Sequence, residues 1–193
     1  MMRELVYYVA VSLDGFIAGP AGEYDAFLVE GDHMATVFGR FADAIPTGPA
    51  AALGIAQPAT TFDTVLMGWN TYAVGLPFGM TSPYSHLRQL VFSRSRTAEN
   101  EDVTTTAENP VDVVRALKAE EGAGIWLCGG GALAGALADE VDRLVLKVNP
   151  VLLGDGIPLF ASGRSDPRWF ELVESTPYAS GVVIAEYVRR RSI

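Results

Sequence analysis

The feature that most constrains this chain is the stretch IWLCGGGAL at residues 125–133, in which an apolar run ends in three consecutive glycines. The run has the composition of a buried strand, and the ALAGALADE that follows is typical of a helix. Glycine loses more conformational entropy on folding than other residues, and it packs no side chain. Three glycines between a strand and a helix therefore indicate a place where bare backbone is needed, either for a tight turn or for a ligand.

The same succession of strand and helix runs through most of the chain, because β-branched runs alternate with apolar residues at helical spacing. The expected strands are residues 5–11, 63–68, 89–93, 103–105, 124–128 and 143–153. The expected helices are residues 33–45, 69–74, 108–122 and 132–140. This alternation favours an α/β domain with a mainly parallel sheet flanked by helices. Residues 170–175 and 182–190 predict a closing antiparallel hairpin, which makes the sheet mixed.

Local signals refine some of these boundaries. Asn109 is expected to cap the helix that begins at Pro110, and Asn70 or Thr71 to cap the helix after residue 68. Residues 12–25 read as a long ordered loop. Residues 46–61, rich in proline, glycine and alanine, read as a surface connection with at most a short helical turn, and loops of that length are often lids or interface segments.

The bulk composition restricts the class of protein. The 193 residues suit one domain, residues 1–193, and 49% hydrophobic against 19% charged residues is typical of a globular chain. The formal net charge of −9 disfavours nucleic acid and anionic membranes as partners, because it repels phosphate. No apolar run reaches the roughly 20 residues that span a bilayer. The single cysteine, Cys128, fits a reducing compartment, so we expect a cytoplasmic protein.

Three predicted strand ends carry groups that suit an anion. Residues 129–133 would present the free N–H groups of a helix start to a phosphate. Residues 68–71 form a second turn of this kind, and residues 93–96, SRSR, add two guanidinium groups and two hydroxyls. Each stretch alone is equally or better explained as an ordinary or solvated turn. Because ligands collect at the carboxyl ends of parallel strands, the coincidence of all three favours a phosphate-bearing ligand.

Other polar stretches are more ambiguous. Asp14 precedes a glycine, so a self-capping turn is favoured over a catalytic role. Residues 154–156 either wall a ligand site or form a turn that the topology requires. The two histidines, His33 and His86, are expected at the surface, and Cys128 as a small buried apolar residue. Two histidines and one cysteine exclude a zinc deaminase, and no metal site is expected.

Taken in order, five segments resemble the dihydrofolate-reductase-like superfamily, and most closely the C-terminal reductase domain of bacterial riboflavin biosynthesis and its stand-alone relatives. The segments are VAVSLDGFIAG, VLMGWNTY, LVFSRS, IWLCGGGALAGALADEVDRLVLKVNPVLLGDGIPLF and YASGVVIAEY. The resemblance covers nearly the whole chain except residues 46–61. It implies a homodimeric NADPH-dependent reductase of a small heterocyclic or carbonyl substrate, such as 5-amino-6-(5-phosphoribosylamino)uracil. Dihydrofolate reductase activity, a non-catalytic nucleotide-binding module and a protein that uses the fold only for dimerisation stay open as alternatives.

The resemblance also implies roles for individual residues. The diphosphate would lie at Gly129, Gly130, Gly131, Ala132 and Leu133, and the adenosine 2′-phosphate near Gly68, Asn70, Thr71, Ser93 and Arg94. The nicotinamide would lie against Ala10 and Ile17, and the substrate near Asp14, Leu153 and Gly154. A proton donor is expected just after the first loop, where Asp25 is favoured over Glu30 and Asp32.

Two positions depart from the family's pattern. Trp69 stands where the MGR-x-TY pattern has arginine, which removes one phosphate contact that Arg94 and Arg96 are placed to replace. Cys128 stands where riboflavin-pathway reductases often have an acid before the glycines, and this substitution puts the riboflavin-pathway substrate in question.

Overall fold

The computed structural model describes residues 3–161 and 167–190 of the chain. Its strands are β1 (Leu5–Val11), β2 (Phe16–Ala18), β3 (Phe62–Gly68), β4 (Arg88–Phe92), β5 (Val103–Thr106), β6 (Gly124–Gly129), β7 (Arg143–Val148), β8 (Ile157–Pro158), β9 (Phe170–Pro177) and β10 (Val183–Arg189). Its α-helices are α1 (Met34–Arg40), α2 (Thr47–Ala52), α3 (Trp69–Ala73), α4 (Pro110–Ala119) and α5 (Gly131–Ala136). Two short 3-10 helices are η1 (Ala42–Ala44) and η2 (Leu76–Phe78).

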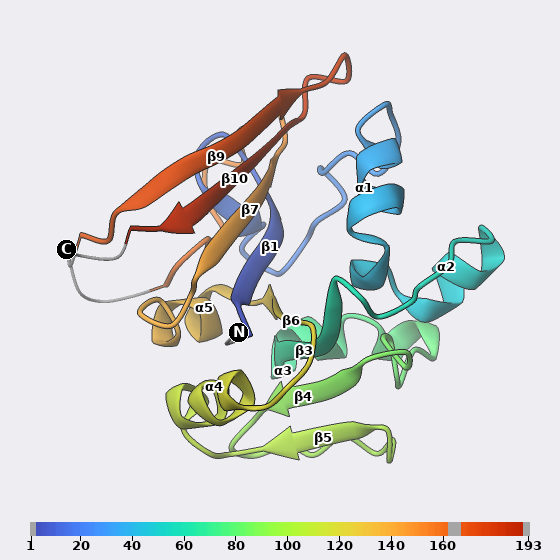
Figure 1. Ribbon diagram of the computed structural model, residues 1–193. Helices are drawn as coiled ribbons and strands as arrows, with labels where there is room; N and C mark the ends of the chain where they lie inside the picture. Colours follow the sequence, from blue (N-terminus) through green and yellow to red (C-terminus); the bar gives the residue numbers. More distant parts are fainter. Residues whose placement is uncertain (1–2, 162–166, 191–193) are drawn as a thin grey trace.

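An eight-stranded sheet with the order β5-β4-β3-β6-β1-β7-β10-β9 forms the centre of the molecule (Figure 1). The pairs among β5, β4, β3, β6, β1 and β7 are all parallel. β10 runs antiparallel to both β7 and β9, so the closing hairpin occupies one end of the sheet. The predicted α/β fold with a mainly parallel mixed sheet and a C-terminal hairpin is confirmed.

Apolar side chains on the two faces of the sheet form two core clusters. Because side chains alternate along a strand, β1 contributes Leu5 and Tyr7 to one cluster and Val6 to the other. The first cluster is covered by residues of α4 and α5, and the second by residues of α1. The expected cap of α4 is present, since the Asn109 side chain accepts a hydrogen bond from the N–H of Val111 at 2.9 Å.

The structure differs from expectation in three local features. The loop expected at residues 12–25 contains β2, which pairs with β8 in a separate two-stranded sheet. The helix expected at residues 33–45 is interrupted at Phe41, where φ is −121° and ψ is 27°. Phe41 is buried and stacks on Tyr8 with ring centroids 4.4 Å apart, so tertiary packing overrides the helical spacing there. The connection at residues 46–61 contains the short helix α2.

Candidate functional site

The parallel strands bring the three predicted anion stretches to one edge of the sheet. In the register, Gly68 lies beside Phe92, the residue before Ser93, and Met67 lies beside Gly129. The carboxyl ends of β3, β4 and β6 are therefore neighbours, although the three stretches lie far apart in the sequence.

The glycine turn after β6 lies against the turn after β3. A Cβ added to Gly68 would lie 3.6 Å from the backbone nitrogen of Gly130. A Cβ added to Gly129 would lie 3.6 Å from the Thr71 hydroxyl oxygen, and one added to Gly130 would lie 3.4 Å from the same atom. Gly129 has a φ of +142°, which other residues rarely adopt, and the peptide bond from Gly129 to Gly130 is cis. Gly68, Thr71, Gly129 and Gly130 thus form one cradle lined mainly by backbone.

Two helices begin at this cradle without a side-chain cap. The N-cap of α3 is Gly68 and that of α5 is Gly130, and neither helix has a side-chain hydrogen bond at its cap. The expectation that Asn70 or Thr71 caps α3 was wrong, because both residues already lie in its first turn. The first N–H groups of a helix have no partner within the helix, so both ends leave donors for a ligand.

The other residues of the glycine stretch also have structural reasons for their identity. A Cβ on Gly131 would come within 2.3 Å of the Pro158 carbonyl oxygen, so close packing on β8 alone requires glycine. The Leu133 side chain is buried in the core, whereas Ala132 is exposed. Any ligand contact from Gly131 or Leu133 would therefore come from the backbone.

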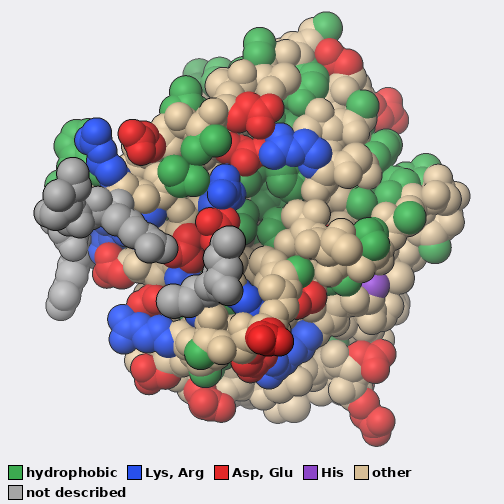
Figure 2. All heavy atoms as spheres, in the orientation of Figure 1, with side chains coloured by type: hydrophobic (Ala, Val, Ile, Leu, Met, Phe, Trp, Pro, Cys, Tyr) green, Lys and Arg blue, Asp and Glu red, His purple; other side chains and the backbone are tan. Residues whose placement is uncertain are grey.

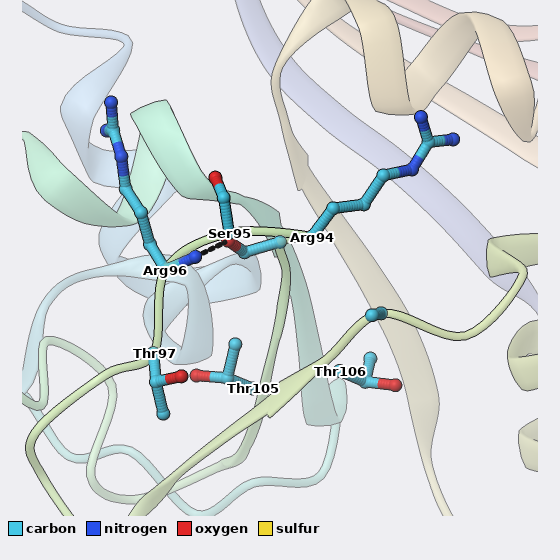
Figure 3. Close-up of a pocket in the computed structure, with 8 residues that line it drawn as sticks. Arg94, Ser95, Arg96, Thr97, Thr105 and Thr106 are labelled. Carbon is cyan, nitrogen blue, oxygen red and sulfur yellow. Dashed lines mark hydrogen bonds between the residues drawn. The ribbon is translucent and has the colours of Figure 1, made fainter.

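A pocket of about 360 Å³ lies beside the cradle, at the ends of β4 and β5 (Figure 3). It is lined by Ser93, Arg94, Ser95, Arg96, Thr97, Thr105, Thr106 and Ala107. The Arg96 N–H donates to the Ser93 hydroxyl at 2.9 Å and closes the turn. Figure 3 shows the side chains of Arg94 and Arg96 extending away from each other, with the Ser95 hydroxyl between them. Sequence reasoning missed Thr105 and Thr106, which only the pairing of β4 with β5 brings here.

Neither arginine of this pocket forms an ion pair with a described residue. By contrast, the arginines paired with carboxylates include Arg3, Arg40, Arg88, Arg115, Arg143 and Arg168. On the face of the molecule shown in Figure 2, basic side chains lie among acidic ones. In a chain of net charge −9, two arginines that line one pocket and have no ion-pair partner among the described residues suit an anionic ligand.

Trp69, the departure from the family pattern, lies against this pocket. The Arg96 guanidinium lies 5.6 Å from the centre of the Trp69 ring, within the range of a cation–π contact. The Trp69 ring in turn packs edge-on against Tyr72, with centroids 5.4 Å apart. The indole therefore helps to position the guanidinium of Arg96, a relation that sequence reasoning did not foresee.

The predicted substrate residues are brought together, but their polar groups already bond to one another. The Asp14 carboxylate accepts hydrogen bonds from the Ser12 hydroxyl at 2.5 Å and from the N–H groups of Gly154 and Leu153 at 2.7 and 3.2 Å. The Ser12 hydroxyl, followed by the Gly154 N–H, holds the pKa of Asp14 below its ordinary value. Asp14 thus clamps the first loop to residues 153–154.

The predicted nicotinamide residues lie along the adjoining strands. Ala10 is in β1, beside Lys147 of β7 in the register. Ile17 is in β2, which pairs with β8. Both side chains are half-buried.

The expected proton donors lie outside any buried cleft. Asp25 and Glu30 are exposed, and Asp25 has no hydrogen-bond or ion-pair partner in the part of the chain that the structure describes. Asp32 accepts hydrogen bonds from the N–H groups of Ala179 and Ser180 at 2.7 and 3.1 Å, so it ties the start of α1 to the β9–β10 turn. The role of Asp25 as an acid stays a prediction.

The cysteine fits its expectation, and the two histidines differ from each other in exposure. Burial raises the pKa of the Cys128 thiol to about 12, so the group is a neutral thiol at physiological pH. The expectation of a surface position was wrong for His33, whereas His86 is half-buried and keeps partial exposure. His33 is fully buried and lies 3.0 Å from the Ser180 hydroxyl, and His86 contacts the Thr47 hydroxyl at 2.8 Å and the Asp43 carbonyl at 2.9 Å.

The fold and the paired glycine turns define a protein of the dihydrofolate-reductase-like class. Residues 3–184 match the RibD C-terminal domain family, and the chain belongs to that family of reductase domains. Among the described residues, no helix could span a membrane, and no cluster of three or more His, Cys, Asp or Glu side chains could hold a metal ion.

Known proteins similar to the chain include both sequences and solved structures. The chain is 34% identical over 166 residues to the uncharacterized protein YwjB of Bacillus subtilis (strain 168), covering 83% of this chain and 84% of YwjB. A putative riboflavin biosynthesis protein from Shewanella sp. PV-4 superposes with a TM-score of 0.71 at 25% identity, over 99% of this chain and 100% of that one. Dihydrofolate reductase from Enterococcus faecalis, complexed with NADP(H), shares the fold, with a TM-score of 0.63, 14% identity and coverage of 99% and 100%.

Proposed function

We propose that the protein is an NADPH-dependent reductase of the riboflavin-pathway type, which transfers hydride to a small heterocyclic or carbonyl substrate such as 5-amino-6-(5-phosphoribosylamino)uracil. The observation that carries this proposal is the assembly at one sheet edge of a backbone cradle and a pocket with two arginines that have no ion pair within residues 3–161 and 167–190. Membership in a family of reductase domains supports the same reading.

The groups at this edge fit the two phosphate positions of NADPH. The cradle of Gly68, Thr71, Gly129 and Gly130 offers N–H donors and no side chain that would exclude a diphosphate. Beside it, Ser93 and Arg94 suit the 2′-phosphate that distinguishes NADPH from NADH. Arg96, positioned by Trp69, supplies the charge that the family's arginine would otherwise bring.

The protein's part in the reaction is to bind, orient and exclude water. A bound nicotinamide cofactor supplies the hydride, and Ala10 and Ile17 form the wall against which its ring would lie. The clamp between Asp14 and residues 153–154 holds the loops on either side of that wall in a fixed arrangement.

We also propose that the protein is a cytoplasmic homodimer. The edge strand β9 and the residue before it expose Trp169, Leu172 and Val173, each more than half exposed. Apolar side chains on an unpaired sheet edge favour association with a second copy. Sedimentation velocity would test the dimer: a single species at the mass of one chain would exclude it.

The test of the function combines binding with turnover. We would titrate the protein with NADPH and NADH, following nicotinamide fluorescence, and then measure NADPH oxidation with the phosphoribosylamino pyrimidine and with dihydrofolate. We expect tight binding with a preference for NADPH, and turnover of the pyrimidine. Binding without turnover of either substrate would favour a nucleotide-binding module, and absence of binding would reject the proposal.

A further inference from the structure

Lys147 is one of only two lysines in the chain, and it lies at the wall proposed for the nicotinamide. In the parallel register of β1 and β7, Lys147 is the direct neighbour of Ala10. Adjacent strands are about 4.8 Å apart, so the two residues lie side by side. Alternation along the strands places Tyr8, Ala10, Val145 and Lys147 on the same face of the sheet.

The ammonium group of Lys147 is only partly used by the protein. It donates one hydrogen bond, to the Leu28 carbonyl at 2.9 Å, and it forms no ion pair with a described residue. The other lysine, Lys118, is buried and lies 2.6 Å from the Asp142 carboxylate. A lysine ammonium has three donors, so two N–H groups of Lys147 remain for a ligand.

The surroundings make an ammonium without an ion pair costly at this place. The side chain is half-buried, and desolvation lowers the pKa of Lys147 below its ordinary value. A partly desolvated charge without a carboxylate partner is a feature of functional sites more than of structural ones. The nearby Tyr8 hydroxyl also has no hydrogen-bond partner among the described residues.

We propose that Lys147 is the proton donor of the reductase and contacts the substrate heteroatom next to the carbon that is reduced. This inference rests on the proposed function. Reduced nicotinamide delivers hydride, with its two electrons, to the C=N or C=O carbon, and the π-bond pair moves to the heteroatom. A Lys147 N–H proton then forms the new N–H or O–H bond, and the neutral amine regains a proton from water.

Several titratable groups share this region and would influence the proton transfer. His33 and Asp32 lie at the start of α1, Tyr178 is in the hairpin turn, and Glu186 lies two residues beyond the β10 partner of Lys147. Glu186 is engaged by Arg40 and Arg143, and Asp32 by the backbone of the hairpin turn. This leaves Lys147 as the cation on this face without an ion pair among the described residues.

A purely structural role would have different consequences. Lys147 and Asn149 both bond to Leu28, through its carbonyl oxygen and its N–H respectively, so Lys147 could serve only to hold the first loop. Arginine at position 147 can keep the charge and the bond to Leu28. It cannot release a proton at working pH, because a guanidinium group stays protonated there. Lys147→Arg therefore separates proton donation from loop positioning.

A first experiment observes the ammonium directly. Protein labelled with 13C at the lysine ε-carbon should give one side-chain signal for each of the two lysines, and Lys147→Arg and Lys118→Arg would assign them. We expect the Lys147 signal to titrate below the ordinary value of about 10.4 and to shift when the phosphoribosylamino pyrimidine is added without cofactor. A Lys147 signal that titrates at the ordinary lysine pKa and does not shift when the pyrimidine is added would overturn the inference.

A second experiment measures catalysis. We expect Lys147→Arg and Lys147→Met each to lower kcat by about 100-fold, with NADPH affinity unchanged and the alkaline limb of the pH profile lost in the arginine variant. Lys118→Arg should keep both kcat and the pH profile. Full activity of Lys147→Arg would contradict the role of Lys147 as proton donor and leave the proposed function intact. Failure of the wild-type protein to bind NADPH would contradict the proposed function itself.

Discussion

The two halves of the candidate site differ in how much of their bonding capacity the protein uses itself. At the ends of β3, β4 and β6 lie bare glycine backbone and two arginines that form no ion pair with the residues that the structure describes. At the ends of β1 and β7, the predicted polar residue Asp14 already bonds to Ser12, Leu153 and Gly154. We propose that the first half binds the charged groups of a ligand, and that the second half holds the loops in place. We therefore expect most of the affinity for the proposed cofactor to come from the first half.

The largest effect is expected from filling the cradle. Gly130→Val should weaken NADPH and NADH alike by about 100-fold, equivalent to ~2.8 kcal/mol, because the side chain would occupy the space beside Thr71 where the diphosphate is proposed to lie. Fluorescence titration of both cofactors measures this. Gly48→Ala is the matched control, since a Cβ there meets nothing within 4 Å. Unchanged binding in a folded Gly130 variant would mean that the glycines serve only the turn.

A smaller and selective effect is expected in the arginine pocket. Arg94→Ala should weaken NADPH by about 10- to 30-fold and leave NADH nearly unchanged, because only NADPH carries the 2′-phosphate. Arg88→Ala is the control, because Arg88 lies at the start of β4, whereas Arg94 follows its end, and Arg88 pairs with Glu120. Equal losses for the two cofactors would remove the proposed 2′-phosphate role from Arg94.

A substitution at Trp69 tests how the arginine pocket obtains its preference for NADPH. Trp69→Arg restores the arginine of the family's pattern, and we expect it to raise the preference for NADPH over NADH only about threefold. The gain is small because the substitution also removes the ring that positions Arg96. The ratio of the two dissociation constants measures it, and a lower NADPH preference would show that the Trp69–Arg96 pair matters more than the added charge.

The smallest effect is expected at the clamp. Asp14→Asn should lower the melting temperature by a few degrees, about 2–4 °C, without weakening NADPH binding. Because the folded-state pKa of Asp14 is lowered, its contribution is present above the unfolded value of about 3.9 and is lost as the pH falls through the folded value. The difference between variant and wild type should therefore shrink in acid, as thermal unfolding at pH 7 and below pH 3 would show. A difference that persists in acid would contradict a role for the carboxylate charge.

Much of the fold could be predicted because its signals are local. Residues close in the sequence determine the strand runs, the Asn109 cap and the closing hairpin, and all three are present in the structure. The order of the motifs along the chain was enough to indicate the family. The break at Phe41 and the burial of His33 could not be predicted, because each depends on a partner distant in sequence, Tyr8 for Phe41 and Ser180 for His33.

The candidate site also has features that local sequence predicts and features that depend on distant contacts. The sequence alone determined which stretches could bind phosphate, since a glycine turn and an arginine turn each carry their chemistry within a few residues. Only the tertiary structure decided which stretches meet, because the order β5-β4-β3-β6-β1-β7-β10-β9 joins strands through crossovers rather than in chain order. That pairing placed Thr105 in the arginine pocket and Lys147 beside Ala10, and the packing of α5 on β8 placed Gly131 against Pro158. No spacing in the sequence records those contacts, because they arise from packing between segments that the chain itself keeps far apart.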